Sequence, residues 1–89
     1  MTEFLLELYA AKTTCAAVAL GAERLGRAAA ELTAEGTPVR IVRSIFISED
    51  ETCFVLVEAT TAEDVRDTAR RAELPFERVV ATTFDIEAP

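Results

Sequence analysis

The chain has 89 residues, a formal net charge of −7 and 51% hydrophobic residues. This length predicts a single domain over residues 1–89, in which about 60–65% of the unfolded surface becomes buried. The negative charge, without any long basic run, excludes nucleic acid and anionic membrane surfaces as expected partners. No apolar segment approaches the ~20 residues that span a bilayer, and residues 1–3 lack a basic signal-peptide start, so we expect a cytoplasmic protein.

Histidine is absent, and the two cysteines, Cys15 and Cys53, stand far apart in the chain. The absence of histidine removes the most common general base and the most common metal ligand. In a cytoplasmic protein the cysteines are expected to be free thiols. We therefore expect no metal site and no other cofactor.

Residues 3–9 predict the first strand, because apolar side chains alternate onto one face. That apolar face suits a core and consists of Phe4, Leu6 and Leu8. The opposite face combines Leu5 with two polar candidates for a functional site, Glu7 and Tyr9.

Apolar residues then recur at intervals of four and three, which predicts an amphipathic helix. The stripe consists of Val18, Ala22, Leu25, Ala29 and Leu32. Thr13 or Thr14 is placed to cap the first turn, Gly21 marks a late start or a kink, and Gly36 followed by Pro38 ends the helix.

Two runs rich in β-branched and aromatic residues, 39–47 and 53–59, flank the polar connector 48–52 and predict a β-hairpin. The connector contains three acidic residues but no glycine and no calcium-loop spacing. We expect it to be a solvated turn.

The register of this hairpin decides which side chains share a face. A turn at the acidic connector places Ser48 opposite Cys53 and Arg43 opposite Glu58. Val42 then belongs to the other face. The face that carries Arg43 and Glu58 also carries Ile41, Ile45, Ile47, Phe54 and Leu56.

Thr60 and Glu63 have the spacing of a capping box and predict the start of a second helix. Its narrow apolar stripe consists of Ala62, Val65, Ala69 and Ala72. Leu74 and Pro75 end the helix, and residues 76–85 predict a last strand.

The predicted order, β-α-β-β-α-β, is the ferredoxin-like pattern. It indicates an α+β fold with a four-stranded antiparallel sheet and both helices on one face. We expect strands 3–9 and 53–59 to be parallel neighbours at the centre of this sheet. The face without helices is then left uncovered.

The uncovered face is expected to gather four polar residues among apolar neighbours: Glu7, Tyr9, Arg43 and Glu58. Such a face is unfavourable in water, so we expect a homodimer that packs sheet to sheet and holds a small molecule in the enclosed cleft. Arg43 can hold a carboxylate or enolate oxygen, and a cleft carboxylate can act as acid or base. A Glu–Arg pair across two strands is more often a register lock or a dimer contact than a ligand site, and this alternative stays open.

Several segments resemble one family of small bacterial domains of unknown function that includes a nickel-binding protein. The segments are Val39-Arg40-Ile41-Val42-Arg43-Ser44, Glu49-Asp50-Glu51-Thr52-Cys53-Phe54, Val57-Glu58-Ala59, Ala69-Arg70-Arg71-Ala72 and Leu74-Pro75-Phe76-Glu77-Arg78-Val79-Val80. The resemblance implies a ferredoxin-like fold that dimerises through its sheet, and Glu7 and Glu58 match positions of the family. Arg43 and Thr68 replace histidines that are usual in the family, so nickel binding is not carried over.

Three functions stay open at this point. The leading hypothesis is a homodimeric module that binds a small, partly apolar ligand between its subunits. The second is a cofactor-free isomerase or monooxygenase-like enzyme that uses a cleft carboxylate. The third is a structural or regulatory protein whose open sheet binds another chain.

Overall fold

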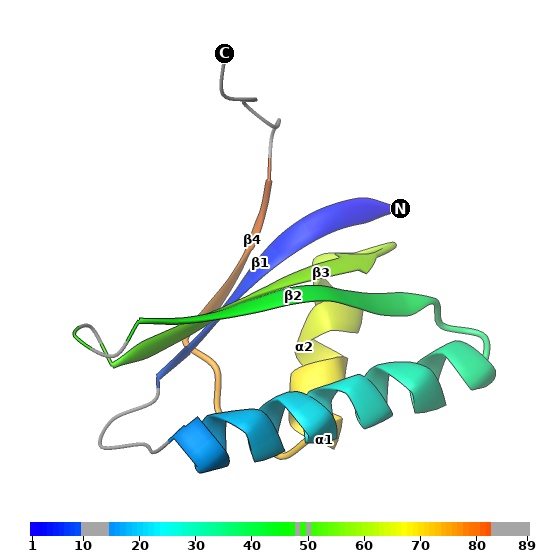
Figure 1. Ribbon diagram of the computed structural model, residues 1–89. Coiled ribbons are helices and arrows are strands. Elements are labelled where there is room, and N and C mark those ends of the chain that lie inside the picture. Colours follow the sequence, from blue (N-terminus) through cyan, green and yellow to red (C-terminus); the bar gives the residue numbers. More distant parts are fainter. Residues whose placement is uncertain (10–14, 48, 50, 83–89) are drawn as a thin grey trace.

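The computed structural model describes residues 1–9, 15–47, 49 and 51–82. The elements are β1 (Thr2–Tyr9), α1 (Cys15–Ala34), β2 (Val39–Ile47), β3 (Thr52–Ala59), α2 (Ala62–Arg71) and β4 (Arg78–Ala81). Both helices lie on one side of the sheet (Figure 1). The predicted element order and α+β fold class are therefore confirmed.

The strands form one sheet in the order β2-β3-β1-β4, and every neighbouring pair is antiparallel. The prediction that β1 and β3 are parallel is wrong. The crossover through α1 makes β2 parallel to β1 but leaves a gap of one strand between them. The tight hairpin then returns β3 into that gap, running opposite to both neighbours.

A single apolar core fills the space between the sheet and the helices. The predicted alternation of β1 is confirmed, since its buried side chains are Phe4, Leu6 and Leu8. The helices add the buried residues Leu25, Ala28, Ala29, Leu32, Val65, Ala69 and Ala72. Thr68 is also fully buried, and its hydroxyl donates to the Asp64 carbonyl oxygen at 2.8 Å. This bond satisfies the polar atom that α2 carries into the core.

A β-bulge interrupts the pairing of β2 with β3 between Ile41 and Arg43. Val42 is the extra residue and is exposed, whereas Ile41 packs against the core on the helix side. The predicted faces of these two residues are therefore wrong. A bulge adds one residue to one strand, so it reverses the side-chain alternation beyond it.

The bulge and the turn together shift the hairpin away from the predicted register. Cys53 lies opposite Phe46 rather than Ser48, and Arg43 lies opposite Leu56 rather than Glu58. The residue that faces Glu58 is Arg40.

Helix α1 continues through Gly21 and ends in a Schellman motif. The N–H of Thr37 donates to the Leu32 carbonyl at 2.8 Å, and the N–H of Gly36 donates to the Thr33 carbonyl at 3.1 Å. Gly36 has the left-handed φ of 99° that this position requires. The predicted role of Gly36 is therefore confirmed.

Helix α2 begins one residue later than predicted. Its N-cap is Thr61, whose hydroxyl oxygen accepts a hydrogen bond from the Asp64 N–H at 3.2 Å, so Thr60 is not the cap. The helix ends in the same motif as α1, but here Glu73 occupies the left-handed position with φ 59°. The N–H of Leu74 closes the motif on the Ala69 carbonyl at 2.9 Å.

The last strand begins at Arg78 rather than at residue 76. Residues 83–85 of the predicted strand lie outside the described residues, as do the candidate caps Thr13 and Thr14. Within the described residues, no helix is both long enough and apolar enough to cross a membrane.

We expect Glu73→Gly to stabilise the fold by about 1 kcal/mol, because glycine adopts the left-handed conformation without steric cost. For a chain of this size, that gain raises Tm by roughly 4–8 °C. Thermal unfolding followed by circular dichroism measures the change. Gly36→Ala is the matched control and should lower Tm, since it places a Cβ at the equivalent left-handed position of α1. A lower Tm for Glu73→Gly would contradict the assignment.

Candidate functional site

The face of the sheet opposite the helices, here called the open face, arranges its side chains in rows that cross the strands. The rows are Arg40, Glu58 and Glu3; then Arg43, Leu56, Leu5 and Val80; then Ile45, Phe54, Glu7 and Arg78; and finally Ile47, Thr52 and Tyr9. The two middle rows combine five apolar side chains with three charged ones, and the first row is fully charged. Strand alternation forces this arrangement, because the intervening residues of β1 and β3 point into the core.

Large apolar side chains remain accessible on the open face. Ile45 is 38% exposed, Ile47 37% and Val80 42%. Leu5, Phe54 and Leu56 beside them are half-buried. A contiguous apolar patch on a sheet is a feature of surfaces that bind a partner or a ligand.

Glu58 forms an ion pair with Arg40, with 2.8 Å between the Arg40 guanidinium and the Glu58 carboxylate. The predicted pair between Arg43 and Glu58 is therefore wrong. The bulge at Val42 is the physical reason, because it changes which arginine of β2 lies opposite Glu58.

Glu7 is held by a residue that the sequence analysis missed. The Nε of Arg78 donates to the Glu7 carboxylate at 2.6 Å, and the Glu7 side chain is only 17% exposed. Arg78 lies directly opposite Glu7 in the β1–β4 register. The sequence could have indicated this pair only if the start of β4 at Arg78 had been known, because that boundary fixes which residue of β1 lies opposite Arg78.

The expected cluster of Glu7 with Glu58 is also wrong. Glu58 lies opposite Glu3, and Glu3 and Glu7 are separated along β1 by about 13 Å at the usual rise of a strand. The antiparallel direction of β3 causes this separation, because it places Glu58 near the start of β1 rather than its end.

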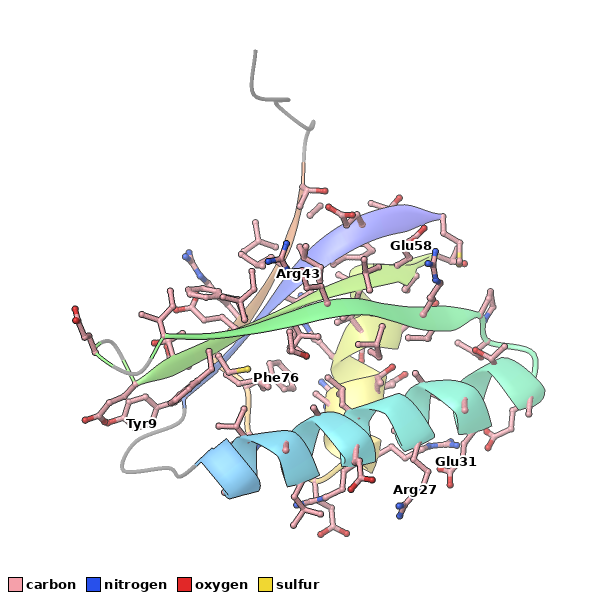
Figure 2. The ribbon with its side chains drawn as sticks, in the orientation of Figure 1. Tyr9, Arg27, Glu31, Arg43, Glu58 and Phe76 are labelled. Atoms are coloured by element: carbon pink, nitrogen blue, oxygen red, sulfur yellow. The ribbon has the colours of Figure 1, made fainter. Side chains whose placement is uncertain are left out.

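Arg43 stands among apolar residues, opposite Leu56, and its side chain rises from the open face (Figure 2). Among the described residues no carboxylate pairs with it. The other two arginines of the open face, Arg40 and Arg78, are both paired. Arg43 therefore offers a guanidinium with free donors next to an apolar surface.

Tyr9 lies at the end of β1, where its hydroxyl donates to the Glu51 carboxylate at 3.2 Å. This hydrogen bond, together with the negative charge of Glu51, raises the pKa of the Tyr9 hydroxyl. No hydrogen bond or ion pair joins any two of the four predicted site residues within the described part of the chain. Glu7, Arg43 and Glu58 share the open face, but they occupy separate rows.

Comparison with known proteins relates this chain to one bacterial family. The model of the family described as nickel responsive protein SCO4226-like matches residues 11–81. This chain belongs to that family. The crystal structure of SCO4226 from Streptomyces coelicolor A3(2) superposes with a TM-score of 0.78, covering 94% of this chain and 99% of that chain at 13% identity, which supports the fold. A search of curated proteins found no match.

The residues of this SCO4226-like chain do not fit a nickel site. Nickel in proteins favours imidazole and thiolate ligands, and the chain has no histidine. Cys53 is buried, and burial raises the pKa of its thiol, which disfavours the ligating thiolate. Arg43 is on the open face whereas Thr68 is in the core, so these two positions lie on opposite sides of the sheet. The described residues contain no group of three or more potential metal ligands.

We expect a titration of Ni²⁺ into the metal-free protein at neutral pH to show no stoichiometric binding by calorimetry. An Arg43→His variant supplies an imidazole on the open face and should bind Ni²⁺ more tightly than the parent chain. A saturable one-to-one isotherm with the parent chain would show that this assignment of the donor set is wrong.

Tyr9 gives a direct optical test of the strand-end geometry, since it is the single tyrosine and tryptophan is absent. The absorbance of the Tyr9 tyrosinate should appear at a pH above the ordinary tyrosine pKa of about 10. In Glu51→Gln the pKa of Tyr9 should fall toward that ordinary value. Because the folded pKa is raised, the contact stabilises the fold below pH about 10 and ceases to do so as the pH rises through the folded pKa. Glu49→Gln, which changes a neighbouring charge, is the control. An unchanged titration in Glu51→Gln would rule out the contact.

Proposed function

We propose that this SCO4226-like protein is a cytoplasmic homodimer that binds a small, partly apolar carboxylate between its two open faces. The observation that carries the proposal is Arg43, whose guanidinium lacks a carboxylate partner in the described structure and stands in an apolar row. A guanidinium presents a planar fork of donors that matches a carboxylate. A buried free thiol, Cys53, is consistent with a reducing compartment.

Charge balance supports association of one open face with a second copy. The open face carries as many arginines as glutamates: Arg40, Arg43 and Arg78 against Glu3, Glu7 and Glu58. These charges cancel, so the net charge of −7 of the chain comes from residues outside this face. Two copies that meet through this face therefore avoid the like-charge repulsion that other surfaces would impose.

The apolar rows define the rest of the ligand. Leu56 lies directly opposite Arg43, and Phe54 follows one row further along β3. A carboxylate held by Arg43 would place its apolar body over these side chains and away from water. An isologous dimer brings two such arginines to one cleft, because each copy contributes the same surface.

Catalysis receives less support from the geometry. Glu7 and Glu58, the carboxylates expected to act as a base, each accept a charge-assisted hydrogen bond, at 2.6 Å and 2.8 Å respectively. A substrate that approached either carboxylate would first have to displace its arginine partner. A binding module is therefore the better reading of the open face.

The dimer is tested by light scattering at micromolar concentration, where we expect twice the mass of one chain. Leu56→Lys places a charge in the centre of the open face and should give monomers. Leu20→Lys adds the same charge to an exposed position of α1 and should leave the dimer intact. A monomeric parent chain, or a dimer that survives Leu56→Lys, would contradict assembly through the open face.

The ligand class is tested by calorimetry with phenylacetate and its uncharged amide. We expect phenylacetate to bind, and Arg43→Gln to weaken it roughly 10–100-fold through loss of a charge-assisted hydrogen bond. Arg27→Gln is the matched control, because Arg27 is an exposed arginine of α1 far from the sheet (Figure 2). Equal affinity for the amide, or equal losses in both variants, would refute recognition through Arg43.

A further inference from the structure

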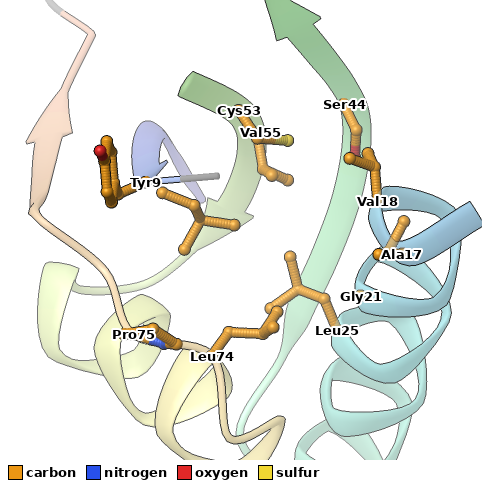
Figure 3. Close-up of a pocket in the computed structure, with 12 residues that line it drawn as sticks. Tyr9, Ala17, Val18, Gly21, Leu25, Ser44, Cys53, Val55, Leu74 and Pro75 are labelled. Carbon is orange, nitrogen blue, oxygen red and sulfur yellow. The ribbon is translucent and has the colours of Figure 1, made fainter. Parts of the chain in front are cut away.

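A cavity of about 210 Å³, partly open to solvent, lies on the helix side of the sheet, between the first half of α1 and the central strands (Figure 3). Its strand residues Leu8, Ser44, Cys53 and Val55 lie on the side of the sheet opposite the open face, and Tyr9, at the end of β1, belongs both to the last row of the open face and to this lining. Its lining residues are Leu8, Tyr9, Ala17, Val18, Gly21, Ala22, Leu25, Ser44, Cys53, Val55, Leu74 and Pro75.

Among the described residues, the lining contains no charged side chain. Its polar groups are the Ser44 hydroxyl, the Cys53 thiol and Tyr9, whose own hydroxyl is already donated to Glu51. An ionised molecule would lose its hydration in such a cavity without a compensating partner. The chemistry of the wall therefore selects an uncharged guest with a mainly apolar body.

Gly21 keeps one wall of the cavity recessed. A Cβ built at this position would meet the Cδ2 atom of Leu74 at 3.6 Å, which is ordinary van der Waals contact. A longer side chain at position 21 would have to enter the cavity. Gly26 in the same helix has no atom within 4 Å of its would-be Cβ and does not line the cavity.

The volume is large enough for a small ring. Apolar cavities of about 150 Å³ are known to stay dry and to take up benzene. A cavity of about 210 Å³ leaves room for a ring with a substituent. Ser44, on β2, can exchange one hydrogen bond with that substituent, since its hydroxyl makes none among the described residues.

The geometry points to a second binding site in this cavity, which takes a small uncharged molecule with one aromatic ring and a single polar group. This site is independent of the carboxylate site on the open face. It uses different residues, the opposite side of the sheet and the opposite preference for charge.

The test uses p-cresol as the probe and calorimetry or amide chemical shifts as the readout. We expect a dissociation constant on the order of 1 mM or below, as a ligand of this size allows. Gly21→Leu should weaken binding at least about tenfold by filling the cavity, whereas Gly26→Leu should not. Both variants add the same side chain to α1, so thermal unfolding verifies that each remains folded.

Charge selectivity and independence from the open face complete the test. 4-Hydroxybenzoate, in which a carboxylate replaces the methyl group, should bind at least about tenfold more weakly than p-cresol. Arg43→Gln should leave p-cresol affinity unchanged, and Gly21→Leu should leave phenylacetate affinity unchanged. Loss of p-cresol binding in Arg43→Gln, or equal affinity for both phenols, would overturn the second site without bearing on the first.

A thiol-protection assay provides a readout that needs no substitution in the cavity. In a Cys15→Ser background, Cys53 is the single remaining thiol, and alkylation by iodoacetamide reports access to it. Saturating p-cresol should slow this alkylation severalfold, while phenylacetate should not. An alkylation rate that p-cresol leaves unchanged would overturn the proposal even if Gly21→Leu failed to fold.

Discussion

The antiparallel pairing of β1 with β3 is the constraint on which the rest of this structure depends. It aligns Thr2 with Ala59 at one end and Tyr9 with Thr52 at the other, and β1 also pairs with β4. One set of alternating side chains from these strands forms the floor of the core, and the other set forms the rows of the open face. A slip of one residue in the pairing would move the core side chains to the open face and the open-face side chains to the core. Burial of Leu6 and Val57 therefore fixes the register, and with it the composition of the open face.

Local patterns predicted the parts of the fold that local physics controls. Alternation in β1, the apolar stripes of the helices and the glycine that ends α1 depend on residues near one another in the chain, and they were recovered with one exception. Ala22 of the predicted α1 stripe is exposed, and Ala28 is buried in addition to the stripe. Strand direction is not local. The parallel arrangement expected for β1 and β3 failed because it ignored that a hairpin reverses the chain between β2 and β3. The bulge at Val42 was missed because an exposed valine in an apolar run resembles its neighbours.

The candidate site shows the same division. Glu7, Arg43 and Glu58 were expected on the open face because strand alternation places them there, and the structure agrees. The ion-pair partners predicted for them were wrong. Alternation along a strand decides which face a side chain occupies, but the register between strands decides which residue lies opposite it. Arg40 takes the place expected for Arg43, and Arg78 neutralises Glu7. Both glutamates have an arginine partner within the chain, whereas Arg43 has no carboxylate partner among the described residues.

The bulge has a consequence for how the sheet can associate. β2 and β4 are the two edges of the sheet, and an edge with free backbone groups can recruit a strand from another molecule. The bulge interrupts the regular backbone of the first edge, and the described part of the second edge is four residues long. Within the described residues, neither edge presents a long regular template for added strands. Within the described residues, the bulge in β2 and the shortness of β4 therefore disfavour the growth of a polymer by addition of strands to either edge.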